Sequence, residues 1–325
     1  MNKYKWVTHI LMVMATLGAF SSLSGAQTYP TKPIRLIIPF SVGGSTEVMT
    51  RPIAEKMGEH LGQPVVLDFK GGAGGNIGTA IAASAPPDGY TLLVGIISPL
   101  AINVSLYKNL PYNPEKDFTP ISMMAKLPNA LALHPSVPAQ NLKELIALAK
   151  QYPGKLTYAS AGSGTTNHMF GELFKIEAGV SIRHIPYKGA GPAMIGVVSG
   201  EVGMSFSGTA AAMAHINSGR LRAIAVTGAK RTPALPEVPT MIESGLAVEG
   251  TAWYSLVAPA GTTTSIVNRL RDAVIYAVES PQVRQSLLNQ GAVPETSTPT
   301  ELRDLIKSEI KRWSKIVQVS NIKIQ

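Results

Sequence analysis

The sequence predicts an α/β fold in which mostly parallel strands carry helices on both faces, arranged as two successive units. Short apolar runs, of the kind found in buried parallel strands, alternate along the chain with segments whose apolar residues recur at helical spacing. Turns rich in glycine and serine join several of these runs to the helical segment that follows. A repeated order of strand, helix and strand is typical of parallel sheets covered by helices.

The first unit begins at residue 34. Its strands are expected at residues 34–40, 65–69 and 91–97, and its helices at 46–61 and from the glycine-rich loop 71–75 to about 84. In the first helix Met49, Ile53, Met57 and Leu61 recur at intervals of four, which places them on one buried face. A second unit is expected to begin near Leu127.

In the second unit Asn141 and Glu144 form the pattern of a capping box, which predicts a helix from there to about residue 151. Further strands are expected at residues 156–159, 182–186, 202–206 and 221–226, and further helices at 166–177 and 193–199. Residues 255–258 are expected to form a strand that returns to the first unit, with Trp253 and Tyr254 packed in the core or at a hinge.

The end of the chain is expected to be helical. Ser280 followed by proline, and Thr298 followed by proline and then Glu301, are typical N-termini of helices. The last helix should present one apolar face, which we expect to dock on the first unit. That face consists of Leu302, Leu305, Ile306, Ile310, Trp313 and Val317.

The N-terminus has the layout of a secretory signal peptide. Lys3 and Lys5 precede an apolar run over residues 7–20, and the small residues Ser24 and Ala26 fit cleavage after Ala26. A membrane anchor is the alternative, but the run is shorter than the roughly 20 residues that span a bilayer. The chain has no Cys, so neither a lipid-bearing cysteine nor a disulfide is available. We therefore expect an exported protein that is not a lipoprotein.

The charge of the chain argues against nucleic acid as its partner. The formal net charge is +9, and removal of the two lysines of the signal peptide leaves +7. Lysine and arginine are scattered, and aromatic residues make up only 6% of the chain. A positive protein of this kind is expected to attract small anions weakly rather than to bind nucleic acid.

Two glycine- and serine-rich loops are the segments best suited to bind a ligand. Each lies between a strand and a helix, so each presents backbone N–H groups and the positive end of a helix dipole, which together hold anions. Glycines let the backbone approach a ligand, and hydroxyls add donors and acceptors. Ordinary turns capped by Ser or Thr remain the alternative. The residues concerned are Ser41, Gly43, Gly44, Ser45 and Thr46 in the first loop and Gly162, Ser163, Gly164, Thr165 and Thr166 in the second.

Sharper motifs are missing from the sequence. Neither the glycine-rich segment 72–77 nor the segment 162–167 completes a dinucleotide fingerprint, and there is no P-loop, nucleophile elbow or zinc-protease motif. We therefore expect no cofactor, no metal and no enzymatic activity. Two further residues stay open: His168 either contacts the ligand or supports the second loop, and Glu47 either favours the helix dipole or binds a substrate amine.

Eight ordered segments resemble one family, the Bug extracytoplasmic receptors, which are the binding proteins of tripartite tricarboxylate transporters. Together these segments extend over essentially the whole chain after the expected signal peptide. They are YPTKPIR (29–35), PFSVGGST (39–46), GAGGN (72–76), PDGYTL (87–92), KLTYAS (155–160), HIPYKG (184–189), PEVPT (236–240) and APAGT (258–262).

The resemblance implies a two-domain periplasmic binding protein fold of type II with a ligand cleft between the domains. Domain 1 would comprise residues 27–126 and 250–325, and domain 2 residues 127–249. The protein would be a monomer that binds a small organic acid by its carboxylate and delivers it to the membrane subunits of the transporter. The implied ligand-binding residues are Phe40, Ser41, Gly43, Gly44, Ser45, Thr46, Ala161, Gly162, Ser163, Gly164, Thr165 and Thr166, with Ser98 and Ser207 as weaker additions.

The chain departs from the family pattern at two acidic positions. Glu47 stands where the family often has Asp, and Ser207 stands where it often has an Asp soon after the residue matching Phe206. Both changes weaken the case for an amino-acid ligand and favour a dicarboxylate or an acid with a neutral tail. Two other functions remain open: a sensor that docks on a signalling partner, and a periplasmic enzyme that would have to use His168 or Glu47.

Overall fold

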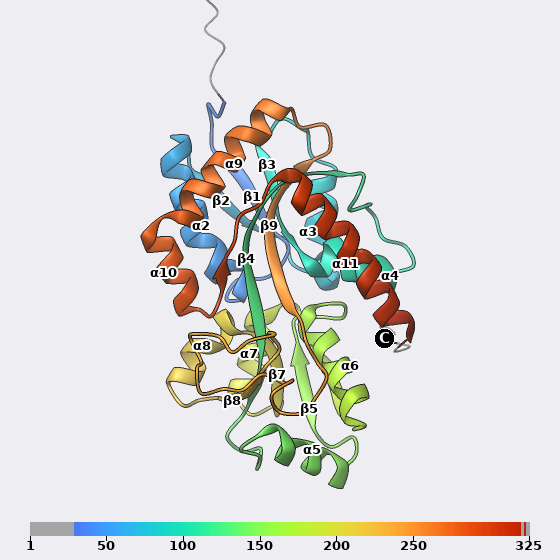
Figure 1. Ribbon diagram of the computed structural model, residues 1–325. Helices are drawn as coiled ribbons and strands as arrows, with labels where there is room; N and C mark the ends of the chain where they lie inside the picture. Colours follow the sequence, from blue (N-terminus) through green and yellow to red (C-terminus); the bar gives the residue numbers. More distant parts are fainter. Residues whose placement is uncertain (1–28, 320–321, 323–325) are drawn as a thin grey trace, which may run out of the picture.

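The protein is described here by a computed structural model that covers residues 29–319 and 322, so the expected signal peptide lies outside the described residues. The chain forms two lobes stacked along the long axis of the molecule, with the two termini of the described chain in or near the upper lobe of Figure 1. Two long strands, β4 (Phe118–Leu133) and β9 (Thr251–Pro259), run through the junction between the lobes.

The upper lobe is built on three parallel strands. Strand β1 (Ile34–Ile38) lies between β2 (Val65–Phe69) and β3 (Thr91–Ile96). Apolar side chains of β1 and β3 are fully buried, as the apolar runs predict. The helical segments of this lobe are α2 (Ser45–Leu61), η2 (Ala73–Gly75), α3 (Asn76–Ala83), η3 (Ser98–Ile102), α4 (Asn103–Leu106), α9 (Thr264–Glu279), α10 (Pro281–Asn289) and α11 (Pro299–Val319).

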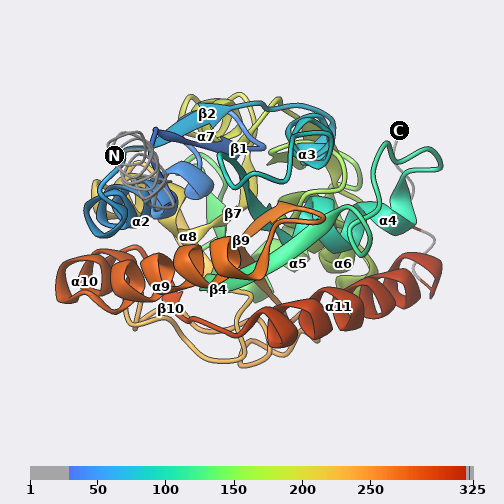
Figure 2. The ribbon, with the colours of Figure 1, turned by 90° about the horizontal axis from the view of Figure 1, so that it is seen from above.

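Strand β4 joins the sheets of the two lobes into one. Its first part pairs antiparallel with β9, from Phe118 opposite Pro259 to Pro128 opposite Thr251. Its last part pairs with β7 and β8 of the lower lobe, and the two-residue strand β10 (Val293–Pro294) pairs with its middle. The strand order is therefore β2-β1-β3-β9-β4-β7-β5-β6. Figure 2 shows α9, α10 and α11 in a row on one side of β4 and β9.

The lower lobe contains a second set of parallel strands, in which β5 lies between β6 and β7. Its core is rich in aromatic side chains, with Tyr158, Phe170, Phe174 and Phe206 fully buried. Its elements are α5 (Leu142–Gln151), β5 (Thr157–Ser160), α6 (Thr166–Ala178), β6 (Arg183–Pro186), α7 (Ala190–Val198), β7 (Met204–Gly208), α8 (Thr209–Asn217) and β8 (Arg222–Val226).

The predicted α/β class is confirmed, and most predicted elements lie within a few residues of their expected positions. The Asn141 side chain accepts a hydrogen bond from the Glu144 N–H at 3.0 Å, as expected of the capping box. The sequence did not predict β4, β10, η3, α4, α8 or α9. Helix α7 begins at Ala190 rather than at residue 193, and β9 begins at Thr251 rather than at residue 255. No helix within the described part of the chain is long and apolar enough to cross a membrane.

The last helix packs on more than the first unit. Leu302, Ile306 and Trp313 are buried, and α11 contacts η3, α4 and β4 in the upper lobe, as its apolar face predicts. Near its C-terminus, however, the Trp313 ring meets the Phe170 ring of the lower lobe edge to face, with centroids 6.5 Å apart. Helix α11 therefore bridges both lobes.

Candidate functional site

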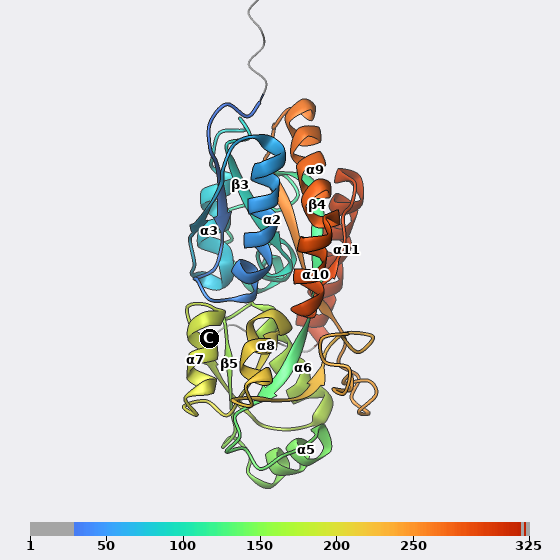
Figure 3. The same cartoon turned by 90° about the vertical axis from the view of Figure 1, so that its left-hand side faces the viewer.

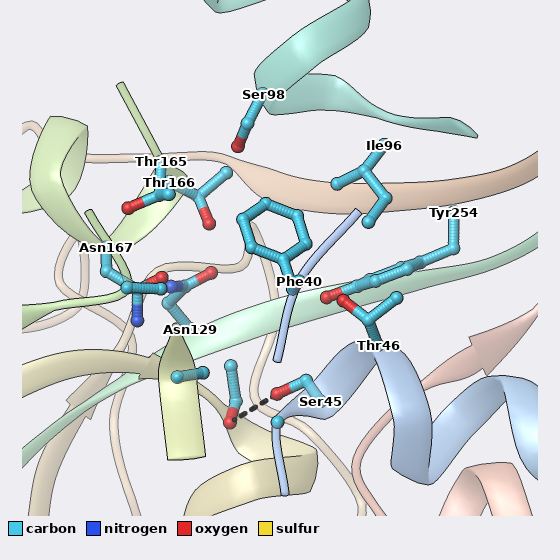
Figure 4. A pocket seen from close by; sticks show the side chains of 14 residues that line it. Phe40, Ser45, Thr46, Ile96, Ser98, Asn129, Thr165, Thr166, Asn167 and Tyr254 are labelled. Atoms are coloured by element: carbon cyan, nitrogen blue, oxygen red, sulfur yellow. Dashed lines mark hydrogen bonds between the residues drawn. The ribbon is translucent and has the colours of Figure 1, made fainter. Parts of the chain in front are cut away.

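A cavity lies between the two lobes, at the ends of strands from both. It encloses about 450 Å³ of space that no atom fills, including its open mouth. Its lining combines residues of the first loop, the second loop and the two strands β4 and β9 that run between the lobes (Figure 4). The lining residues are Phe40, Gly44, Ser45, Thr46, Ile96, Ser98, Asn129, Ala161, Thr165, Thr166, Asn167, Ala190, Gly208 and Tyr254.

Four helix N-termini meet at this cavity. Gly44 is the N-cap of α2, Thr165 that of α6 and Gly208 that of α8, while Ala190 is the first residue of α7. In none of these four helices does the N-cap residue cap the helix with its own side chain, although the Ser45 hydroxyl accepts one N–H of the first turn of α8, that of Ala211. The first N–H groups of a helix have no partner inside the helix, and its dipole makes this end positive. The cavity is therefore a place where backbone donors and partial positive charge are concentrated.

The side chains around the cavity are neutral. The lining residues that the structure describes include no Asp, Glu, Lys, Arg or His. Hydroxyls come from both lobes, and the walls formed by Phe40, Ile96 and Ala161 are apolar. The Tyr254 hydroxyl lies beside Thr46, and burial raises the pKa of Tyr254 well above its ordinary value, so this phenol stays neutral. An anionic ligand in this cavity would interact with helix dipoles and backbone N–H groups rather than with a positively charged side chain.

Hydrogen bonds join the two lobes beside the cavity, so this is a closed arrangement. Figure 3 shows α7 and α8 of the lower lobe lying below α2 and α3 of the upper lobe. The Ser45 hydroxyl lies 3.3 Å from the Gly208 carbonyl oxygen, to which it donates, and accepts from the Ala211 N–H at 3.2 Å. The Tyr107 hydroxyl donates to the Ser163 carbonyl oxygen across the same junction. Gly164, with φ +83°, packs against Asn103 of the upper lobe, where a side chain has no room. The first loop therefore contacts the start of α8, and the second loop contacts the segment around α4.

Eight of the predicted site residues line the cavity, and eight do not. Those that line it are Phe40, Gly44, Ser45, Thr46, Ser98, Ala161, Thr165 and Thr166. Those that lie elsewhere are Ser41, Gly43, Glu47, Gly162, Ser163, Gly164, His168 and Ser207. Most of the second group belong to the loops behind the lining. Ser207 is different: it is buried in β7, and its hydroxyl pairs with that of Ser205 at 2.9 Å.

Glu47 is turned back onto its own loop. Its carboxylate accepts a hydrogen bond from the Gly43 N–H at 2.7 Å and pairs with Arg51 one turn along the helix. Partial burial raises the pKa of Glu47, but the hydrogen bonds from Arg51 and Gly43 outweigh this and hold it below its ordinary value. The Glu47 carboxylate therefore lies outside the cavity and stabilises the first loop through its hydrogen bond with the Gly43 N–H.

His168 supports the second loop from behind. Its Nδ1 accepts the Gly164 N–H at 3.2 Å, and its ring stacks on that of His184, whose Nε2 lies 2.6 Å from the Ser160 hydroxyl. Burial lowers the pKa of both histidines, and that of His184, which also faces His168, to about 3. Both rings are therefore neutral near pH 7, as the acceptor role of His168 requires. They line a separate hollow with Glu172 and Lys175.

Six lining residues were missed from the sequence: Ile96, Asn129, Asn167, Ala190, Gly208 and Tyr254. Tyr254 was expected in core or hinge packing, but the returning strand β9 brings it to the cavity wall. Gly208 is the N-cap of α8, a helix that was not predicted, and Ala190 begins α7, which was predicted to start at residue 193. The sequence analysis therefore did not place either residue at a helix N-terminus. Within the described residues, no group of His, Cys, Asp and Glu could hold a metal ion.

Comparison with known proteins relates the chain and its fold to one family. Residues 49–322 match the model of the tripartite tricarboxylate transporter family receptors. Protein BugT of Bordetella pertussis is 38% identical over 327 residues, covering 100% of both chains. The structure of Rhodopseudomonas palustris Rpa4515 with adipate is 35% identical, with a TM-score of 0.88 over 91% of this chain and 99% of that one. MatC from the same organism, with bound malate, is 32% identical, with a TM-score of 0.85 over 89% and 100%.

Proposed function

The chain belongs to the tripartite tricarboxylate transporter receptor family, to which the Bug receptors belong, and on this premise we propose that it is a periplasmic receptor for a small organic acid. Its ligand would bind by a carboxylate in the cavity between the lobes. The observation that carries the proposal is the meeting of four helix N-termini, none capped by the side chain of its own N-cap residue, at one neutral cavity. Such termini donate several N–H groups to an anion and favour negative charge electrostatically.

The relatives support this ligand class. Adipate is bound to Rpa4515 and malate to MatC, and both proteins share this fold at more than 30% identity. Among the described residues no acidic side chain lines the cavity, and Glu47 is engaged by Arg51 and Gly43. The ammonium of an amino acid would therefore lack an anionic partner, which a buried cation needs. We propose a dicarboxylate, or an acid with an uncharged tail, rather than an amino acid.

We propose that the two lobes are the domains expected from the sequence and that β4 and β9 form the hinge between them. The ligand would bind the open form, and closure would bring the second loop onto it. The closed protein, freed of its signal peptide after Ala26, would act as a monomer and present the acid to the membrane subunits of a tripartite transporter. Capture needs no reacting group, and the cavity offers no carboxylate, imidazole or amine among its described lining residues.

The proposal is tested by a thermal-shift screen of mono- and dicarboxylates on the purified mature protein, followed by calorimetry. An acid present at 100 times its Kd should stabilise the folded protein by about 2.7 kcal/mol. The matched neutral amides, such as succinamide beside succinate, should give no shift because they lack the negative charge. If no organic acid shifts the melting temperature, or if a bound acid is chemically converted, the receptor proposal is wrong.

A further inference from the structure

We propose that the side-chain oxygen of Asn129 accepts a hydrogen bond from a hydroxyl group on the ligand. The receptor would then bind a hydroxylated carboxylate more tightly than the same acid without the hydroxyl. This inference rests on the proposed function and deepens it by naming the ligand class. It is carried by one buried oxygen that has no partner. Asn129 lines the cavity, and its buried side-chain Oδ1 accepts no hydrogen bond from any described residue.

Asn129 occupies the point of β4 where the strand passes from one lobe to the other. The residue is fully buried. Its backbone N–H donates to the Thr227 hydroxyl at 3.0 Å, and its backbone oxygen accepts the Thr227 N–H at 2.8 Å. Its side-chain Nδ2 donates to the Phe206 carbonyl oxygen at 2.5 Å. Strand pairing and this bond fix the side chain, and Oδ1 alone is left unsatisfied.

The orientation of the amide follows from its partner. A carbonyl oxygen such as that of Phe206 only accepts, so the side of the Asn129 amide that faces it must be the NH₂ group. The opposite side is then an acceptor. Figure 4 shows this amide between Asn167 and Phe40, at the cavity. Buried polar atoms are nearly always hydrogen-bonded in folded proteins, so an unpaired acceptor facing a ligand cavity indicates a donor on the guest.

The chemistry of the cavity narrows that donor to a hydroxyl. A carboxylate has no proton to donate, and the helix N-termini already provide for its charge. An ammonium group would donate, but the described lining holds no anion to balance it. A hydroxyl is a neutral donor, and it can also accept a hydrogen bond from the hydroxyl of Thr166, which lines the same cavity. Sites built to hydrogen-bond a substrate hydroxyl discriminate strongly against the analogue that lacks it, because their own polar group is then left unpaired.

The test compares matched acids on the full mature protein by calorimetry. The pairs are L- and D-malate with succinate, lactate with propionate, and 2-hydroxyadipate with adipate. In the pair that binds best, we expect the hydroxylated acid to bind at least 10-fold more tightly. If an acid binds but its hydroxylated partner binds no better in any pair, the hydroxyl inference is overturned while the receptor proposal stands. If none of the acids binds, both fail.

Two variants assign the preference to one side chain. Asn129→Leu keeps the approximate size but removes the acceptor, and it should bring the ratio of hydroxylated to plain acid close to 1. Asn167→Leu removes an amide of the same type from the same cavity; it should weaken both acids while leaving their ratio unchanged. A preference that survives in Asn129→Leu, or disappears in Asn167→Leu alone, overturns the assignment. Circular dichroism and thermal melts check that each variant folds, and the ratio in the unmodified protein remains a test if one does not.

Discussion

The close approach of Gly44 to Ala190 offers a way to block closure without disturbing either lobe. Gly44 lies in the first loop with φ −98° and ψ 169°, an extended conformation that alanine adopts freely. A Cβ added there would lie 3.1 Å from the Ala190 Cβ across the junction, whereas carbon atoms prefer about 3.5–4.0 Å. Overpacking of this kind typically costs about 1–3 kcal/mol. Gly44→Ala should therefore weaken ligand binding by about 5- to 150-fold.

The assay is calorimetry with the acid found in the screen, combined with urea denaturation of the ligand-free protein. Because the open form lacks the contact, the free energy of unfolding without ligand should change little. The double variant Gly44→Ala, Ala190→Gly removes the opposing methyl and should recover most of the affinity. Unchanged affinity in Gly44→Ala, or no recovery in the double variant, would refute closure at this contact. Gly164 is unsuitable for the same test, because its φ of +83° would strain any side chain in both forms.

Three further outcomes are expected. Burial lowers the pKa of both His168 and His184 in the folded protein. Below about pH 6.5 the unfolded chain therefore binds protons at these histidines that the folded protein does not bind. The free energy of unfolding should consequently fall as the pH is lowered from about 6.5 toward 3. The free energy of unfolding should change by about 1.4 kcal/mol per pH unit for each histidine that stays neutral in the folded protein. Urea titrations at pH 7 and 5 measure this change. If His184→Gln loses as much unfolding free energy between pH 7 and 5 as the unmodified protein does, the histidines are not its cause. Asn141→Ala removes the cap of α5 and should cost about 1 kcal/mol of unfolding free energy, with ligand affinity unchanged; a neutral effect would argue against the capping bond to Glu144. Trp313→Ala empties a buried site where α11 meets both lobes and should cost about 3–5 kcal/mol in the same denaturation assay, whereas a cost below 1 kcal/mol would mean that the bridge contributes little.

The strand–loop–helix units could be predicted because each carries its own local signal. The apolar run of β1 and the four-residue spacing in α2 placed the first loop between them, and the pattern repeats at β5 and α6. Once these units are known, the meeting of loops at strand ends follows from parallel-sheet geometry. This explains why the first and second loops were identified and why half of the predicted site residues line the cavity.

The crossover strand β4 could not be predicted in the same way. It contains Pro120 and Pro128, and proline lacks the N–H that a central strand needs, which argues against a strand. The structure accommodates Pro120 next to an irregularity in the pairing with β9, between residues 120 and 122, and Pro128 lies where the strand changes partners. Asn129 therefore stayed hidden from sequence reasoning, although it lies in the cavity.

Helix α8 was missed for a different reason. Its sequence is rich in alanine and has little contrast between its faces, and it follows β7 without an intervening loop. Periodicity does not reveal such a helix, because alanine is compatible with either face. As a result, two of the four helix N-termini at the cavity, those of α7 and α8, became evident only in three dimensions.

The most direct test of the central claim is a crystal structure of the mature protein with an organic acid that binds in the screen. The account predicts one carboxylate of the acid within hydrogen-bond distance of backbone N–H groups at the starts of both α2 and α6, with the lobes closed around it. An acid bound elsewhere, for example in the hollow lined by His168 and Glu172, with the cavity between the loops left empty, would contradict it.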